Sequence, residues 1–413
     1  MTEQYVCAFR GRRDSYQAPL ALAETGQLDL FITDIYAGPW VRSAIRFVPA
    51  SVRAKLKSRC DPGIPTNRVH SLWATTALEH MRHRLGYERM VTFDKLDRRF
   101  ALAAARRARQ MRSHLFLYSS YAWEAFTARY AHTPRKVLFQ YHPHPALERR
   151  LLEEDSARYP RVGELYLGAH PGVMSGVDGQ RESDAWKHAD LIFCASTFTK
   201  RSLLEVGADE NKIHVVPYGV EVSPALESQP SGEAFKVLLV GTGSQRKGLH
   251  HLLLAWQRAK LPASSKLTLV CRTIEPEIEH MAAHVPGVEI IRGVKGAELS
   301  RLYFTSSLFV MPSLVEGFGQ VYLEALAHGC PVLGTSNTGL PDLGGEADGI
   351  FVVSAGRIEE LAGKLESLSR LLSPGREIRR AAHACARRFS WQAFRTGLLQ
   401  RLGNSVSPLC SVR

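Results

Sequence analysis

The chain has 413 residues, of which 45% are hydrophobic and 23% charged, and a formal net charge of +13. This length exceeds one ordinary hydrophobic core, so we expect two domains of roughly 150–220 residues each. No run approaches about 18 consecutive apolar residues, so no transmembrane helix is expected. The N-terminal residues lack a basic-then-apolar signal pattern, and we therefore expect a cytoplasmic protein.

The positive charge is concentrated in the first half of the chain. Residues 42–112 hold 17 Lys and Arg against 5 Asp and Glu. Such a patch suits an anionic membrane surface, an acidic substrate or nucleic acid, and equally a solvated basic face. No zinc-finger spacing, basic-zipper heptad or aromatic RNA-binding signature occurs, so we expect no nucleic acid partner. The seven cysteines contain no Cys-x-x-Cys pair, which indicates reduced structural thiols.

The first 220 residues predict short strands separated by helices. Between 40 and 85 the pattern is poor and interrupted by Pro49, Pro62 and Pro65, which predicts loops and irregular helices. Residues 221–235 are rich in Ser, Pro and Gly and predict a linker. The strands expected before the linker are 5–9, 28–36, 90–93, 114–119, 136–142, 189–196 and 212–219.

The second half alternates more regularly. Strands are expected at 236–241, 267–271, 288–293, 308–313, 331–335 and 349–353. Helices are expected at 249–259, 275–284, 298–304, 321–328, 357–373, 376–389 and 391–402. Strands of four to six residues alternating with helices indicate βαβ units and a doubly wound parallel sheet. We therefore predict an α/β fold with two doubly wound Rossmann-like domains, 1–220 and 236–389, that face each other across a cleft. A C-terminal helix at about 390–405 can pack back on the 1–220 domain.

Ligands bind outside the carboxyl ends of strands in such sheets, and two loops there stand out. The first is GTGSQRKG (241–248), directly before a helix. Gly243 lets the backbone approach a ligand, and Arg246 and Lys247 add two cations at a helix N-terminus, which suits a diphosphate. The spacing is not that of a Walker loop. The competing interpretation is a tight strand–helix turn with exposed basic residues.

The second loop opens the stretch EGFGQVYLEALAHGCPVLGT (316–335). Glu316 precedes a turn whose backbone N–H groups, from Gly317, Phe318 and Gly319, can face a ligand. Glu324 follows on the helix among apolar neighbours, and a half-buried carboxylate needs partners such as sugar hydroxyls. The competing interpretations are a salt bridge to an arginine for Glu324 and a helix N-terminal acid for Glu316.

The first domain offers KVLFQYHPHP (136–145). His142 follows a predicted strand, so it is expected at the ligand-binding edge. A loop histidine stiffened by Pro143 and Pro145 is the competing interpretation. His144 is a second candidate, and the sequence does not choose between the two.

Four motifs together resemble the GT-B, family 4 retaining glycosyltransferases (glycosyl transferases group 1). They are the 316–335 stretch with its Glu-x7-Glu spacing, KVLLVGTGSQRKGLHHLLLAW, ADLIFCASTFTKRSLLEVGADENKIHVVPYGVE and the terminal FSW (389–391). The resemblance covers roughly residues 180–395 and is weak over 1–135.

The resemblance implies a role for each candidate residue. It implies a nucleoside diphosphate sugar as donor, with catalytic positions at Glu316 and His142 near the sugar. The other implied contacts are Gly317, Phe318 and Gly319 with the sugar, Arg246, Lys247 and Gly243 with the diphosphate, Glu324 with the ribose, and Arg272 and Val294 with the base. No Asp-x-Asp motif occurs, so we expect metal-independent chemistry without another cofactor. The resemblance further implies a same-face attack in which the donor phosphate assists deprotonation.

Three positions depart from the family pattern. Thr242 stands where an arginine is usual, Cys271 where glycine is common, and the first loop, Arg10 to Ser15, has one glycine only. Either Arg12 and Arg13 of that loop help to bind acceptor or phosphate, or acceptor binding is unusual. The expected acceptor is a lipid-linked compound or a glycan, reached by peripheral contact with an anionic membrane. The alternatives are a GT-B sugar-nucleotide epimerase and a non-catalytic sugar-nucleotide-binding protein.

Overall fold

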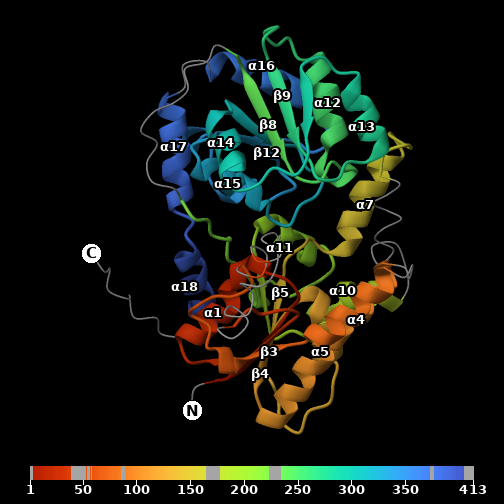
Figure 1. Cartoon of the computed structure of the whole chain (residues 1–413), viewed down its shortest axis with the longest axis vertical. Coiled ribbons are helices and arrows are strands. Elements are labelled where there is room, and N and C mark those ends of the chain that lie inside the picture. Colours follow the sequence, from red (N-terminus) through yellow and green to blue (C-terminus); the bar gives the residue numbers. More distant parts are fainter. Residues whose placement is uncertain are drawn as a thin grey trace.

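The computed structural model describes residues 3–38, 53, 56, 58–84, 89–163, 177–222, 234–372 and 376–403. It contains two parallel sheets, one above the other along the long axis of the molecule, with helices on their faces (Figure 1). The predicted α/β class with two doubly wound sheets is confirmed. We name the parts around these sheets the N-terminal and C-terminal domains.

The N-terminal sheet has seven strands in the order β3-β2-β1-β4-β5-β6-β7. The strand order reverses between β1 and β4. In such sheets ligands bind in the crevice beyond the carboxyl ends of the strands at this point. Its strands are β1 (Tyr5–Ala8), β2 (Leu28–Thr33), β3 (Val69–Ser71), β4 (His114–Tyr118), β5 (Lys136–Gln140), β6 (Leu191–Cys194) and β7 (Ile213–Val215).

The described part of the N-terminal domain contains seven α-helices. They are α1 (Gln17–Glu24), α4 (Trp73–Arg84), α5 (Arg89–Met111), α6 (Trp123–Phe126), α7 (Pro145–Ser156), α10 (Val177–Asp184) and α11 (Thr197–Leu204).

The prediction of a strand at 90–93 is wrong, because these residues lie in α5. The helix buries Leu96, Phe100, Ala104 and Ala108, which recur every four residues and therefore line one helical face. This long-range periodicity outweighs the short β-prone run at its start.

The poorly patterned region between 40 and 85 holds more regular structure than expected. Its described part contains a short 3₁₀ turn (Thr66–Arg68), the edge strand β3 and the regular helix α4. β3 is only three residues long, so its sequence carries too little alternation to be recognised. The start of this region, residues 40–52, lies outside the described residues.

The C-terminal sheet has six strands in the order β10-β9-β8-β11-β12-β13. All of its strand pairs are parallel, so the alternation predicted for this half is confirmed. The strands are β8 (Lys236–Val240), β9 (Lys266–Val270), β10 (Val288–Ile291), β11 (Leu308–Met311), β12 (Val332–Thr335) and β13 (Ile350–Val353). The helices are α12 (Leu249–Arg258), α13 (Pro276–Ala283), α14 (Ala297–Thr305), α15 (Gln320–Ala327), α16 (Ile358–Leu371), α17 (Arg376–Arg387) and α18 (Trp391–Arg401).

The chain crosses between the two domains more than once. The last helix, α18, lies beside α1 of the N-terminal domain (Figure 1). There Arg395 Nε donates to Glu24 Oε2 at 2.9 Å, and Phe394 packs against Phe139 of β5. Of the predicted linker, residues 223–233 lie outside the described part.

A second crossing runs the opposite way through α7. This helix rises from the N-terminal sheet toward α12 of the C-terminal domain (Figure 1). Beyond its end, Tyr159 and Val162 pack into the core of the C-terminal domain. The two domains are therefore joined by packed segments as well as by the linker.

None of the helices in the described ranges combines the length and apolar character needed to cross a bilayer.

Candidate functional site

The loops after β5 and β11 touch each other, which brings the carboxyl ends of the two sheets together. A Cβ atom at Gly317 would lie 2.0 Å from the carbonyl oxygen of Tyr141 and 3.2 Å from the Cα of His142. Only glycine fits this approach. The predicted sugar-binding turn and the predicted first-domain histidine are therefore neighbours.

The N-terminus of α11 holds this turn in place. The hydroxyls of Ser196 and Thr199 both donate to the carbonyl oxygen of Gly317, the latter at 3.1 Å. Ser196 also caps α11 by accepting from the Thr199 N–H at 3.1 Å. Next to it, the Thr197 N–H donates to Asp342 Oδ2 at 2.7 Å. The sequence assigned no role at the site to the hydroxyl pair or to Asp342.

Glu316 is buried between the two cations of the 241–248 loop. Its Oε2 lies 3.1 Å from Arg246 Nη1 and forms a second ion pair with Lys247 Nζ. Burial by itself would raise the pKa of the carboxyl group, but the charges of Arg246 and Lys247 outweigh it and hold the pKa well below its usual range. Glu316 is thus a stabilised carboxylate rather than the simple helix N-terminal acid of the competing interpretation.

The 241–248 loop reaches Glu316 because its last turn is unusually tight. Gly248 has a φ of 66°, and a Cβ there would lie 2.0 Å from the carbonyl oxygen of Pro312. The carbonyl of Arg246 also accepts from the Leu314 N–H at 2.9 Å. The loops after β8 and β11 therefore pack against each other, and their side chains Arg246, Lys247 and Glu316 form one cluster.

Gly243 makes backbone contacts with the loop that follows β9. Its N–H donates to the Thr273 carbonyl at 2.9 Å and its carbonyl accepts from the Glu275 N–H at 2.8 Å. A Cβ at Gly243 would lie 2.5 Å from Ile274 Cγ1. The Gly243 N–H is therefore engaged within the protein in this conformation, and the diphosphate contact of Gly243 stays a prediction.

The structure separates His142 from His144. His144 is buried as the N-cap of α7: its Nδ1 accepts from the Ala146 N–H at 3.2 Å and its Nε2 lies 2.9 Å from the Ser183 carbonyl. His142 lies at the Glu316 cluster, and its buried Nδ1 has no hydrogen-bond partner among the described residues. Burial, followed by the charge of Arg246, lowers the pKa of His142 to about 3, so its ring is neutral near pH 7.

Glu324 is half-buried on α15 and points at a tyrosine rather than an arginine. Its Oε2 accepts from the Tyr303 hydroxyl at 3.1 Å. Within the described ranges it forms no ion pair with Lys or Arg, contrary to the competing interpretation. Burial raises the pKa of Glu324, and the Tyr303 hydrogen bond opposes that rise. One carboxylate oxygen can therefore accept from a ligand without breaking the Tyr303 bond.

The remaining predicted residues surround this cluster. Phe318 is buried against Tyr218, with ring centroids 5.3 Å apart, and its carbonyl accepts from the Gly339 N–H. The turn then passes through Gly319, whose φ of 89° suits glycine. Arg272 is exposed and Val294 half-buried, just beyond the carboxyl ends of the paired strands β9 and β10.

The first loop, Arg10 to Ser15, places Arg13 beside Tyr141, where the loops after β5 and β11 meet. The Arg13 guanidinium carbon lies 3.9 Å from the ring centroid of Tyr141, and its charge contributes to the lowered pKa of His142. Asp14, Ser15 and Tyr16 follow with φ of 46°, 50° and 65°. Left-handed backbone at three successive non-glycine residues is strained and clusters at functional sites. Arg12, by contrast, is exposed.

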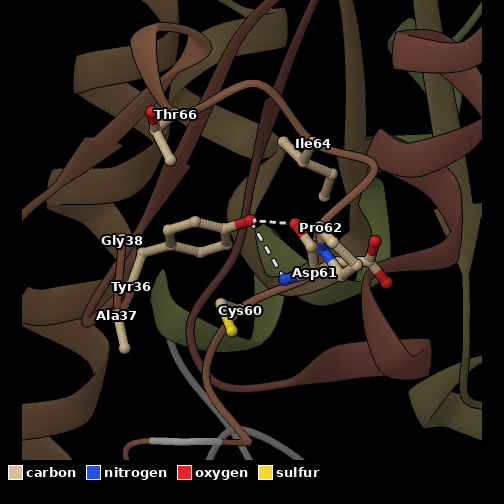
Figure 2. A pocket seen from close by; sticks show the side chains of 8 residues that line it. All are labelled: Tyr36, Ala37, Gly38, Cys60, Asp61, Pro62, Ile64 and Thr66. Atoms are coloured by element: carbon tan, nitrogen blue, oxygen red, sulfur yellow. Dashed lines mark hydrogen bonds between the residues drawn. The ribbon is translucent and has the colours of Figure 1, made fainter. Parts of the chain in front are cut away.

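A cavity of about 230 Å³ lies elsewhere in the N-terminal domain, beyond β2 (Figure 2). Tyr36 spans it, donating its hydroxyl proton to the Asp61 carbonyl at 2.7 Å and accepting from the Asp61 N–H at 3.0 Å. The Tyr36 ring also meets that of Tyr16 at 5.9 Å. The cavity thus lies near Tyr16, which directly follows the first loop, and none of its lining residues belongs to the Glu316 cluster.

Comparison with known proteins agrees with this arrangement. Residues 234–370 match the family described as glycosyl transferases group 1. An MMP alpha-(1->4)-mannosyltransferase from Mycolicibacterium hassiacum is 27% identical over 263 residues, covering 60% of this chain and 61% of that protein. The chain therefore spans about three fifths of this relative.

Solved structures extend the likeness to the whole chain. Sucrose-phosphate synthase from Thermosynechococcus elongatus superposes with a TM-score of 0.66 at 16% identity, covering 97% of this chain and 98% of that one. Anabaena HepE in complex with UDP and glucose superposes with a TM-score of 0.59 at 14% identity, covering 97% and 100%. The chain thus has the GT-B fold, and residues 234–370 are similar to the group 1 glycosyl transferases.

Proposed function

We propose that this protein is a retaining glycosyltransferase that moves a hexose-type sugar from a nucleoside diphosphate sugar to a hydroxyl acceptor in cell-surface glycan or glycolipid biosynthesis. The observation that carries the proposal is the buried Glu316, paired with Arg246 and Lys247 where the loops of both domains meet. The mannosyltransferase relative and the UDP and glucose bound to HepE favour the same class of reaction.

Arg246 and Lys247 bind the donor diphosphate in this proposal. Both lie just before α12, whose N-terminus adds a partial positive charge. Negative charge builds on the departing diphosphate in the transition state, and fixed cations stabilise it without reorganising. The ion pairs with Glu316 keep both side chains in position before the donor arrives.

Glu316 and His142 contact the transferred sugar. A carboxylate accepts hydrogen bonds from sugar hydroxyls, and a neutral imidazole can donate or accept one. The low pKa of Glu316 makes it a weak base and a poor nucleophile, so the proposed role is orientation and charge stabilisation. The acceptor hydroxyl then attacks from the face that the diphosphate leaves and passes its proton to the donor phosphate, without a metal ion.

The nucleoside lies along the C-terminal domain. Glu324 accepts from the ribose hydroxyls through the oxygen that Tyr303 leaves available. The N–H groups of Phe318 and Gly319 face no acceptor among the described residues and serve the sugar or diphosphate. Arg272 and Val294, at the ends of neighbouring strands, line the base.

The acceptor approaches from the N-terminal domain and is lipid-linked or a glycan. α4 exposes Trp73 and Met81, with 65% and 59% of their surfaces accessible, and Leu78 with 44%. Arg106 and Arg109 are exposed on α5, which packs beside α4. Apolar side chains beside basic ones suit the interface of an anionic membrane, so we propose peripheral contact through these two helices.

A donor panel tests the proposed reaction. The purified chain is incubated with UDP-, GDP- and ADP-sugars and a mixture of hydroxyl acceptors, and products are resolved by mass spectrometry. Transfer or donor hydrolysis supports the glycosyltransferase. An epimerised nucleotide sugar would support the epimerase alternative, and binding without turnover the non-catalytic one.

A further inference from the structure

A buried cluster away from the Glu316 site joins the two domains and has the composition of a metal site. It consists of Asp155 in the last turn of α7 and His250 and His251 in the first turn of α12. All three are buried, and one potential ligand atom from each lies within 4.8 Å of the others.

The geometry of the cluster centres on the Asp155 carboxylate. Its Oδ2 lies 3.0 Å from His250 Nε2, and its Oδ1 lies 2.9 Å from His251 Nε2. The two imidazole rings lie side by side, with centroids 4.0 Å apart, although the residues are consecutive on the helix. Both side chains therefore turn toward the same carboxylate.

The contacts leave part of the cluster unsatisfied. His251 Nε2 is close to Asp155 but has no hydrogen bond with acceptable geometry among the described residues. No described lysine or arginine forms an ion pair with Asp155, so its negative charge is buried against neutral groups unless a histidine is protonated. Hydrogen bonds with His250 and Gln245 offset part of the cost of burying this carboxylate, and a bound cation would neutralise its charge.

We infer that Asp155, His250 and His251 bind a divalent zinc-type ion that staples α7 to α12. Two imidazoles and one carboxylate form a three-ligand set found for zinc, with a fourth position left for a water molecule. Zinc bonds of about 2.0–2.2 Å place tetrahedral ligand atoms roughly 3.4 Å apart. The cluster needs to open by only a few tenths of an ångström at its shortest contacts.

A second layer of contacts already orients the carboxylate. Gln245 Nε2 donates to Asp155 Oδ2 at 2.9 Å and also to the Leu152 carbonyl at 3.0 Å. Ligating carboxylates in metal sites are commonly hydrogen-bonded in this way.

An ion bound between α7 and α12 would hold the proposed active-site loops in fixed relative positions. α7 begins shortly after His142, and α12 begins directly after the loop of Arg246 and Lys247. An ion between the two helices ties these loops together outside the reaction centre. The inference does not depend on the proposed sugar transfer, and the ion takes no part in that chemistry.

The test measures zinc binding by the whole, untagged chain after treatment with a chelator and dialysis. Zinc chloride is titrated against a chromophoric competitor, thermal unfolding is followed with and without zinc, and cobalt(II) is used for its visible spectrum. We expect about one zinc ion per chain, a raised Tm and the intense cobalt absorption of a tetrahedral site. No saturable zinc binding, or only the weak spectrum of hydrated cobalt, would overturn the proposal.

Variants assign the ion to the cluster. Asp155→Asn and His251→Gln retain side-chain size and should weaken zinc binding at least about tenfold, the lower end of losses measured even for outer-layer partners. His280→Ala/His284→Ala is the matched control, because this exposed pair at the C-terminal end of α13 also has ring centroids only 4.5 Å apart. Binding lost in this control, or unchanged in the cluster variants, would contradict the assignment. Should both cluster variants unfold, the cobalt spectrum of the unaltered chain decides.

Discussion

The guanidinium of Arg246 lies 3.1 Å from the carboxylate of Glu316, across 70 residues of sequence. Lys247 joins the same carboxylate, so a single buried acid organises both cations proposed for the diphosphate. Removing the acid should leave two like charges facing each other without an intervening partner. The anionic diphosphate should then bind as well as before, or better, while the sugar loses its contact.

Glu316→Gln is accordingly expected to lower kcat on the order of 10²–10³-fold, as for loss of one preorganised polar group. Affinity for the free nucleoside diphosphate should be unchanged or increased. Steady-state kinetics and calorimetric titration check the two quantities, with the exposed Glu298→Gln on α14 as control. Equal losses of turnover and nucleotide affinity would contradict this division of roles.

Glu324→Gln should act on donor binding instead. Loss of the carboxylate weakens the proposed ribose contact by about 1–3 kcal/mol, which corresponds to roughly 5- to 150-fold in KM with little change in kcat. Tyr303→Phe removes the partner of Glu324 Oε2 and serves as comparison, since it should have a smaller effect on KM. A fall in kcat without a rise in KM for Glu324→Gln would reject the ribose assignment.

Gly317→Ala should disturb the contact between the domains. The added Cβ would lie 2.0 Å from the Tyr141 carbonyl, which is backbone and cannot rotate away. We expect a loss of about 1–3 kcal/mol in the free energy of unfolding, typical of overpacking, and a large fall in turnover. Gly241→Ala is the control, because a Cβ there meets nothing within 4 Å. Denaturant unfolding of both variants measures the difference, and equal stabilities would count against the contact.

His142 should reduce stability on the acid side. Its pKa is about 3 in the folded chain and near 6.5 when unfolded, so the unfolded state binds the proton first as pH falls. Between these values each pH unit of acidification costs up to about 1.4 kcal/mol through this group, and above pH 6.5 it costs nothing. His142→Gln should therefore flatten the acid limb of a stability–pH curve.

The control for that measurement is His70→Gln, because His70 is an exposed histidine of the same domain. Unfolding free energies from pH 7 to pH 4 distinguish the two variants. An acid limb that is the same in His142→Gln as in the unaltered chain would mean that His142 titrates normally.

The basic surface of α4 and α5 can be tested without damaging the fold. Arg107 must be spared, because it makes a bidentate contact with the buried Asp29, at 2.7 and 3.1 Å. Trp73→Ser/Met81→Ser and Arg106→Glu should each lower sedimentation with anionic liposomes several-fold, at about 1 kcal/mol per basic side chain. Leu371→Ser and Lys260→Glu, exposed in the C-terminal domain, are the matched controls. Unaltered sedimentation of the α4 and α5 variants would remove the membrane proposal.

Much of the C-terminal domain could be predicted because its signals are local. Apolar runs of four or five residues, each ending near a glycine or polar turn, gave the strands of that sheet nearly to the residue, β8 and β12 among them. The Glu-x7-Glu stretch and the 241–248 loop likewise identified Glu316, Arg246 and Lys247 as candidates. Their roles remain predictions, whereas their convergence on one point is observed.

The N-terminal domain was harder to predict because its signals are long-range or weak. The start of α5 reads as a strand over four residues and becomes recognisable as helix only from the face that follows it. The contact of Arg13 with Tyr141 joins residues 128 positions apart, and no local pattern announces it. The adjacent histidines of α12 were visible in the sequence, but their partner Asp155 was not.

The sequence by itself determined the α/β class and the alternation of strands and helices, because each depends on a short local pattern, and it supplied candidate residues for a nucleotide-sugar site. Only the tertiary structure decided which side chains share a site. It separated His142 from His144 because one ring caps α7 while the other lies at the Glu316 cluster. It also gave Gly243 a packing role, because backbone contacts with 273–275 use its N–H. Both outcomes depend on contacts between distant segments, which the folded chain alone creates.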